Sequence, residues 1–136
     1  FVFGDITMLA TRLGDRCSFA VTAHSVRNSV TDEMRELVAL GKVKAELAQY
    51  VLSRYSEEGF EDDLGLAECT VLVRKHKDEQ LMQLMNAWWE EFVENKVYRD
   101  QISLMYCIWK QGFEAYELME GHVMNNQYCT TMSHSR

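Results

Sequence analysis

The sequence contains no proline, no long apolar run and no excess of positive charge. The absence of proline fits a helix-rich chain but decides little. No stretch reaches the roughly 18 apolar residues of a membrane-spanning helix, and no basic and apolar signal pattern opens the chain, so we expect a cytoplasmic protein. The net charge of −7 would repel phosphate backbones, which argues against a nucleic-acid partner.

Patterns typical of metal knuckles are also missing from this chain. Its four cysteines are widely spaced in apolar surroundings and include no C-x-x-C pair, which predicts buried, reduced thiols. Its four histidines have neither H-x-x-x-H nor H-E-x-x-H spacing, so a closed zinc site is not indicated.

The residues that are present predict one α/β domain. A length of 136 residues with 47% hydrophobic residues suits a single core, so we expect residues 1 to 136 to form one domain. The chain begins at Phe1 inside an apparent strand, which suggests a fragment of a larger domain. Strands separated by helices favour a mixed or parallel sheet flanked by helices.

The expected elements follow from periodicity and β-branched content. Buried strands are predicted over residues 1 to 9, 17 to 24 and 69 to 76. Helices are predicted over residues 31 to 40, 43 to 58, 78 to 95 and 102 to 110, with a helix or helical turn over 113 to 121. Thr31 and the acids after it would begin the first helix, Glu68 would precede the third strand, and the acids at 57 to 63 would lie in a solvated loop.

The segment "RDQIS", residues 99 to 103, has two interpretations. Asp100 could cap the helix that follows, its carboxylate accepting a backbone N–H from residue 102 or 103. Alternatively, Arg99, Asp100 and Gln101 could form the polar edge of a sugar-binding site. The neighbouring apolar positions from 81 to 92 are expected to be core, although Trp88 or Trp89 could offer an apolar platform for a sugar.

Several segments in order resemble a family of glycosyltransferase-like domains that occurs in bacterial polysaccharide-synthesis proteins and in plant cell-wall and mucilage proteins. These segments are "FGDIT", "AHSVR" with Glu33 downstream, "EEGFEDDLGLAECTVLVRKH", "NAWWEEF", "YRDQISLMYCIWK" and a late "HSR". The layout is also similar to the second half of type-A nucleotide-sugar transferases, including glycogenin-like retaining enzymes. The nucleotide-binding strands that such enzymes carry ahead of the acid motif are absent, so the resemblance implies truncation at the amino end.

The resemblance implies a divalent cation, Mn²⁺ or Mg²⁺, that would neutralise the leaving diphosphate. Asp5 matches the acid-motif position, and Thr7 stands where a second acid would be expected. His134 lies roughly where related transferases supply a late histidine ligand. The expected metal ligands are therefore Asp5 and His134.

The resemblance also implies the remaining site residues. Glu68 and Asp100 would be catalytic, either deprotonating an acceptor hydroxyl or supporting positive charge at the anomeric carbon. Guanidinium groups can grip phosphate or sugar oxygens bidentately, and an amide can donate and accept at once. The expected substrate-binding residues are His24, Arg27, Arg74, Arg99 and Gln101.

Three classes of function remain open at this point. The first is a glycosyltransferase, or its carboxyl-terminal catalytic portion, that moves a sugar from a nucleoside-diphosphate sugar to a glycan or glycoconjugate acceptor. The second is a non-catalytic binding or interaction module, which the missing strands and the missing second acid favour. The third is a metal-dependent hydrolase that uses the same acids on a phosphorylated substrate.

Overall fold

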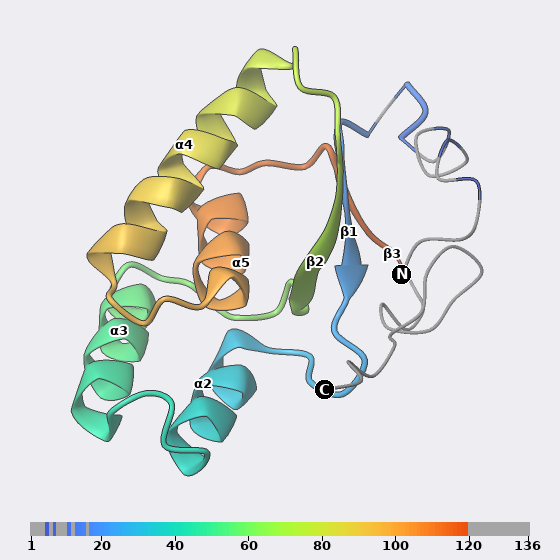
Figure 1. Cartoon of the computed structure of the whole chain (residues 1–136). Helices are drawn as coiled ribbons and strands as arrows, with labels where there is room; N and C mark the ends of the chain where they lie inside the picture. Colours follow the sequence, from blue (N-terminus) through green and yellow to red (C-terminus); the bar gives the residue numbers. More distant parts are fainter. Residues whose placement is uncertain (1–4, 6, 8–10, 12, 16, 120–136) are drawn as a thin grey trace.

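The computed structural model describes residues 5, 7, 11, 13 to 15 and 17 to 119 (Figure 1). In chain order the elements are β1 (Phe19–Ala23), α2 (Val30–Ala39), α3 (Ala45–Glu57), β2 (Ala67–Arg74), α4 (Glu79–Glu94), α5 (Asp100–Lys110) and β3 (Tyr116–Met119). The predicted α/β class is confirmed. None of the described helices has the length and apolar character that a membrane span requires.

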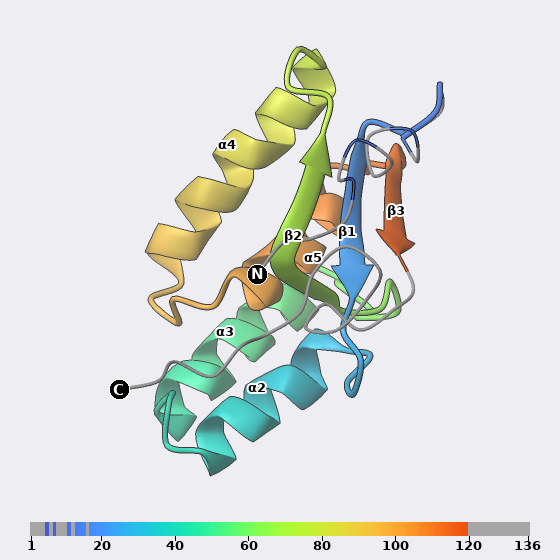
Figure 2. The same cartoon turned by 45° about the vertical axis from the view of Figure 1, so that its right-hand side comes forward.

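The sheet has three described strands in the order β2-β1-β3 (Figure 2). The central strand β1 pairs antiparallel with β2 and parallel with β3, so the sheet is mixed, as predicted. The helices α2 to α5 lie on one side of this sheet in both views (Figures 1 and 2).

Two predicted elements need comment at the chain ends. The strand predicted over residues 1 to 9 lies outside the described residues except for Asp5 and Thr7, and Thr7 has helical backbone. The prediction of a helix over residues 113 to 121 is wrong, because Tyr116–Met119 forms β3. The open edge of β1 supplies backbone hydrogen bonds to this segment, and tertiary pairing of this kind overrides local preference.

The helix α5 forms the centre of the core. Residues 102 to 108 are all buried, which is typical of a helix with neighbours on every side. It packs against α4, β2 and α2. The first turn of α5 is therefore held from several directions, and so is any polar group placed there.

The loop before β2 is tied to the start of α2. The Asp62 carboxylate accepts hydrogen bonds from the backbone N–H groups of Val30, at 2.7 Å, and Thr31, at 2.8 Å. The helix begins at Val30, one residue before the predicted start at Thr31, and its N-cap is Ser29, whose Oγ accepts from Asp32 N at 3.1 Å. The acidic loop is thus anchored at Asp62 and not simply solvated.

Candidate functional site

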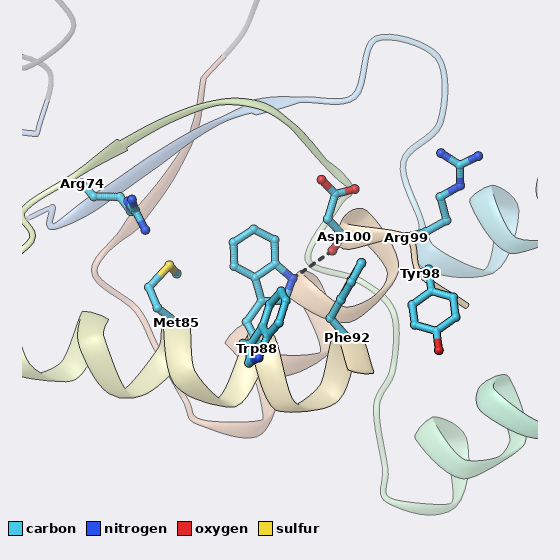
Figure 3. A pocket seen from close by; sticks show the side chains of 8 residues that line it. Arg74, Met85, Trp88, Phe92, Tyr98, Arg99 and Asp100 are labelled. Carbon is cyan, nitrogen blue, oxygen red and sulfur yellow. Dashed lines mark hydrogen bonds between the residues drawn. The ribbon is translucent and has the colours of Figure 1, made fainter. Parts of the chain in front are cut away.

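A cleft with a volume of about 540 Å³ opens beside α4, the end of β2 and the start of α5 (Figure 3). Ligand-binding pockets usually measure about 300–1,000 Å³. The lining residues are Arg74, Met85, Trp88, Trp89, Phe92, Tyr98, Arg99 and Asp100. The structure therefore brings Arg74, Arg99 and Asp100, all expected in a site, around one cavity.

The start of α5 differs from the capping arrangement that the sequence suggested. The N-cap position is Arg99, which makes no side-chain cap hydrogen bond, and Ile102 N donates to Arg99 O at 3.2 Å. Asp100 is the first helical residue, and its Oδ1 accepts from the adjacent Gln101 N at 3.0 Å. The cap to residue 102 or 103 is therefore wrong. The half-buried Asp100 carboxylate borders the cleft instead.

The backbone of Asp100 is fixed by a tryptophan of α4 (Figure 3). Trp88 Nε1 lies 3.1 Å from Asp100 O and 3.1 Å from Ser103 Oγ. Ser103 is fully buried, and its Oγ donates to Asp100 O at 3.3 Å. The "WW" and "RDQIS" segments are thus one structural unit, and the shared polar contacts of Trp88 and Ser103 were not predictable from spacing alone.

An aromatic wall, defined as Trp89, Phe92 and Tyr98, forms one side of the cleft. The Trp89 and Phe92 rings are 5.9 Å apart between centroids and nearly parallel, at 20°. The Phe92 and Tyr98 rings are 5.8 Å apart and inclined at 65°. Trp89 is 67% exposed and Tyr98 is 61% exposed, so the expectation that Trp89 packs in the core is wrong. Its position lies one residue beyond Trp88, which turns it about 100° around the helix toward solvent.

The loop that carries Tyr98 has an unusual backbone. Lys96 and Tyr98 both have positive φ, 57° and 53°, a region that residues other than glycine adopt at a cost. The buried Asn95 supports this turn: its Oδ1 accepts from Val97 N at 2.9 Å, and its Nδ2 donates to Tyr55 Oη at 3.4 Å. Buried interactions therefore keep an exposed tyrosine at the rim of the cleft.

Glu68 lies within β2, not ahead of it as predicted, and it does not line the cleft. Its Oε1 accepts from Thr70 Oγ1 at 3.3 Å. Burial raises the pKa of the neighbouring Cys69 thiol, and the carboxylates of Asp100 and Glu68 raise it further. The carboxylates of Asp100 and Glu68 therefore both lie near enough to Cys69 to influence its thiol. Gln101 is half-buried and is also not part of the cleft lining.

His24, Arg27 and Glu33 form a separate cluster after β1. His24 Nδ1 accepts from the backbone N–H groups of Val26, at 3.2 Å, and Arg27, at 3.0 Å. His24 Nε2 lies 3.9 Å from Glu33 Oε2 and 3.3 Å from Arg27 Nη2. Arg27 Nε donates to the same Glu33 oxygen. This cluster fixes the loop between β1 and α2, and none of its members lines the cleft.

The expected metal ligands are only partly described. The Asp5 carboxylate accepts from Thr7 N at 2.9 Å and from Thr7 Oγ1 at 2.6 Å, and these hydrogen bonds lower its pKa. His134 lies outside the described residues. Within the described part of the chain, no three His, Cys, Asp or Glu side chains gather to hold a metal ion. The described donor set does not by itself fit a cation.

Comparison with known proteins gives a match over nearly the whole chain. The family described as TOD1/MUCI70, glycosyltransferase-like domain, matches residues 7–132. No curated protein and no solved structure gives a significant match. The matched range contains every helix and strand described above and all the residues that line the cleft. The chain therefore belongs to the TOD1/MUCI70 family of glycosyltransferase-like domains.

Proposed function

We propose that this domain is a glycosyltransferase, or its catalytic carboxyl-terminal portion, acting from a nucleoside-diphosphate sugar onto a glycan or glycoconjugate acceptor. Membership of a glycosyltransferase-like family supports the reaction class. The observation that carries the proposal is the Asp100 carboxylate, which borders a cleft with two arginines and an aromatic wall instead of capping its helix.

The proposed roles follow from side-chain chemistry. Asp100 deprotonates an acceptor hydroxyl in an inverting reaction, or stabilises positive charge at the anomeric carbon in a retaining one. Arg74 and Arg99 donate hydrogen bonds to sugar or phosphate oxygens through their guanidinium forks. Glu68, whose carboxylate acts on the Cys69 thiol together with that of Asp100, is the second proposed carboxylate. Direct substrate binding by Gln101, like that by His24 and Arg27, stays a prediction.

A divalent cation remains part of the proposal, with Asp5 and His134 as its ligands. When bound, Mn²⁺ or Mg²⁺ would supply charge neutralisation for the leaving diphosphate. Because Thr7 replaces a second acid, the diphosphate and water would complete the coordination shell. The cytoplasmic location likewise stays a prediction.

A non-catalytic glycan-binding module is the second candidate. One observation favours it: among the described residues, Asp100 is the single carboxylate that lines the cleft. A binding module needs no second carboxylate, whereas glycoside chemistry often uses a pair of them. Glu68 would have to act from beside the cleft if the domain is an enzyme.

The test is to titrate the protein with Mn²⁺ and a panel of nucleoside-diphosphate sugars while following sugar release and transfer. Asp100→Asn should lower turnover by about 100-fold or more while donor affinity changes by less than about threefold, because the amide keeps the shape but cannot accept a proton. Asp63→Asn, in the exposed acidic loop, is the control and should retain activity.

Three outcomes would contradict the proposal in different ways. If the protein neither bound nor turned over any donor in the panel, the transferase function would be rejected. Full turnover by Asp100→Asn would remove Asp100 from the chemistry. A loss of about 1 kcal/mol of stability in Asp100→Asn with unchanged activity would restore a purely structural role at the helix start.

A further inference from the structure

We infer that the aromatic wall of Trp89, Phe92 and Tyr98 is the binding platform for the acceptor glycan, and that it holds a glycan without any nucleotide sugar present. The role of the bound glycan as acceptor rests on the proposed transferase function. The binding itself follows from the exposure, the ring geometry and the polar rim of the cleft.

Two large aromatic side chains of the wall are exposed to solvent. Trp89 and Tyr98 are 67% and 61% exposed, although each has an apolar ring that folding normally removes from water. They adjoin one another through Phe92 and do not stand singly. A contiguous exposed apolar surface beside a cleft is typical of a ligand site.

Tyr98 is presented by a loop with an unusual backbone conformation. Two residues of this short loop, Lys96 and Tyr98, hold positive φ, and the buried Asn95 maintains the turn. Strained backbone conformations of this kind collect at ligand sites. A relaxed loop could place Tyr98 elsewhere, so its position at the rim is imposed by buried contacts.

The rings of Trp89 and Phe92 offer a surface on which a ligand can stack from one side only. Contacts between carbon atoms need about 3.5–4.0 Å, so a flat ligand inserted between two parallel rings would need about 7 Å. Trp89 and Phe92 are nearly parallel at only 5.9 Å, so nothing fits between them. A nucleobase held in a slot is therefore excluded there. A pyranose, which stacks its C–H face on one aromatic face, suits this geometry.

The polar rim completes the match to a sugar. Hydroxyl groups surround a pyranose ring at its edge, and they both donate and accept hydrogen bonds. Asp100 can only accept when it is ionised, whereas Arg74 and Arg99 can only donate. The rim can therefore pair with both the donor and the acceptor sides of sugar hydroxyls, which suits a glycan at this wall.

The experiment uses the full chain without metal, and the oligosaccharide titrations contain no nucleotide. An array of neutral and acidic oligosaccharides identifies ligands, and calorimetry measures their affinity, with UDP as the nucleotide probe. Trp89→Ala should weaken oligosaccharide binding by about tenfold or more, and Trp89→Phe by about threefold or less because a ring remains. Tyr50→Ala, which removes a 64% exposed aromatic on α3, is the matched control and should bind normally. Unchanged melting temperatures would separate lost binding from unfolding.

The results separate this inference from the proposed function. Oligosaccharide binding that depends on Trp89 would support the platform even if no donor sugar is ever transferred. Sugar transfer that is unaffected by Trp89→Ala would overturn the platform while leaving the transferase intact. The platform would be overturned if the protein bound UDP but no oligosaccharide, or if it bound no ligand of the array. Equal losses of oligosaccharide affinity in Trp89→Ala and Tyr50→Ala would also overturn it.

Discussion

Glu91, the last acid of the "WWEE" run, is buried at the interface of α3 and α4. Its Oε1 accepts a hydrogen bond from Tyr55 Oη at 2.8 Å and pairs with the Arg54 guanidinium. Burial raises the pKa of Tyr55, so the phenol remains a protonated donor. This acid of the "NAWWEEF" segment is therefore a structural contact between two helices.

Removal of the Glu91 charge should be costly. Glu91→Gln would leave the largely buried Arg54 without its main partner, and we expect a loss of about 2 kcal/mol in the free energy of unfolding. The adjacent Glu90 is exposed, so Glu90→Gln should change stability by less than about 0.5 kcal/mol. Urea denaturation of both variants tests this, and equal stability of the two would contradict the buried pair.

At the scale of elements, α4 and α5 are coupled through Trp88 and Ser103. Both groups converge on the carbonyl oxygen of Asp100, at 3.1 Å and 3.3 Å. The helix that carries Trp89 and Phe92 thereby fixes the backbone of Asp100. Trp88 is thus a positioning residue, whereas its neighbour Trp89 is part of the aromatic wall of the cleft.

A double-mutant cycle should detect this coupling. Trp88→Phe removes the indole N–H and Ser103→Ala removes the hydroxyl, and each should destabilise the fold by about 1 kcal/mol or more. Because Trp88 and Ser103 share a hydrogen bond at 3.1 Å, the double variant should lose less than the sum, by about 0.5–1.5 kcal/mol. Chemical denaturation of the four proteins measures this difference. Strict additivity would show that Trp88 and Ser103 are not energetically coupled.

The acidic loop and α2 form a second coupled pair of elements. Asp62 accepts from two N–H groups in the first turn of α2, and it holds a positive φ of 57°. Asp62→Ala should therefore cost about 2 kcal/mol, since the cap is lost and alanine tolerates this backbone poorly. The exposed neighbour gives the control, because Asp63→Ala should be nearly neutral. Thermal unfolding compares them, and a neutral Asp62→Ala would exclude the capping role.

At the scale of the whole molecule, an acidic chain uses some of its charges to close the fold. Glu58, after α3, accepts from Lys110 Nζ at 2.8 Å and from Tyr106 Oη at 2.6 Å, both on α5. The hydrogen bond from Lys110, followed by the one from Tyr106, lowers the pKa of Glu58. The hydrogen bonds of Lys110 with Glu58 and with Tyr106 raise the pKa of Lys110. The chain thus joins segments about fifty positions apart through one ionised carboxylate.

Stability should depend on pH through this contact. A carboxyl group whose pKa is lowered by folding stabilises the fold above its unfolded pKa, about 4.3, and this stabilisation is lost as the pH falls through the lowered value. The lysine contribution is present at neutral pH and is lost only as the pH rises through its raised pKa. Because the Glu58 and Lys110 side chains are 35% and 53% exposed, we expect an effect of about 1 kcal/mol or less.

Glu58→Gln isolates the acid limb of this dependence. At pH 7 the variant should be less stable than the parent protein, and near pH 3 the difference should shrink toward zero as Glu58 becomes protonated. Denaturation midpoints at the two pH values measure the change. Glu57→Gln, one residue earlier and exposed, is the control. A difference that is constant with pH would mean that Glu58 acts through packing and not through charge.

The sequence by itself determined the elements whose periodicity is strong. The strand at Phe19–Ala23 and the helices α2 to α5 lie where alternation and helical spacing predicted them, because each buries one consistent apolar face. The family also followed from ordered motifs that are spread along the chain. Periodicity failed for Tyr116–Met119, because its strand exists only through pairing with β1.

The tertiary structure decided which polar and aromatic residues meet. Residues of one motif separate in space: Trp88 positions Asp100, Trp89 faces the cleft, and Glu91 is buried against α3. Spacing along a helix gives the direction of a side chain but not the element that it will meet. Hydrogen bonds between α4 and α5 and the backbone of Tyr98 are long-range consequences of packing, so only the folded chain places Arg74, Asp100 and the aromatic wall around one cleft.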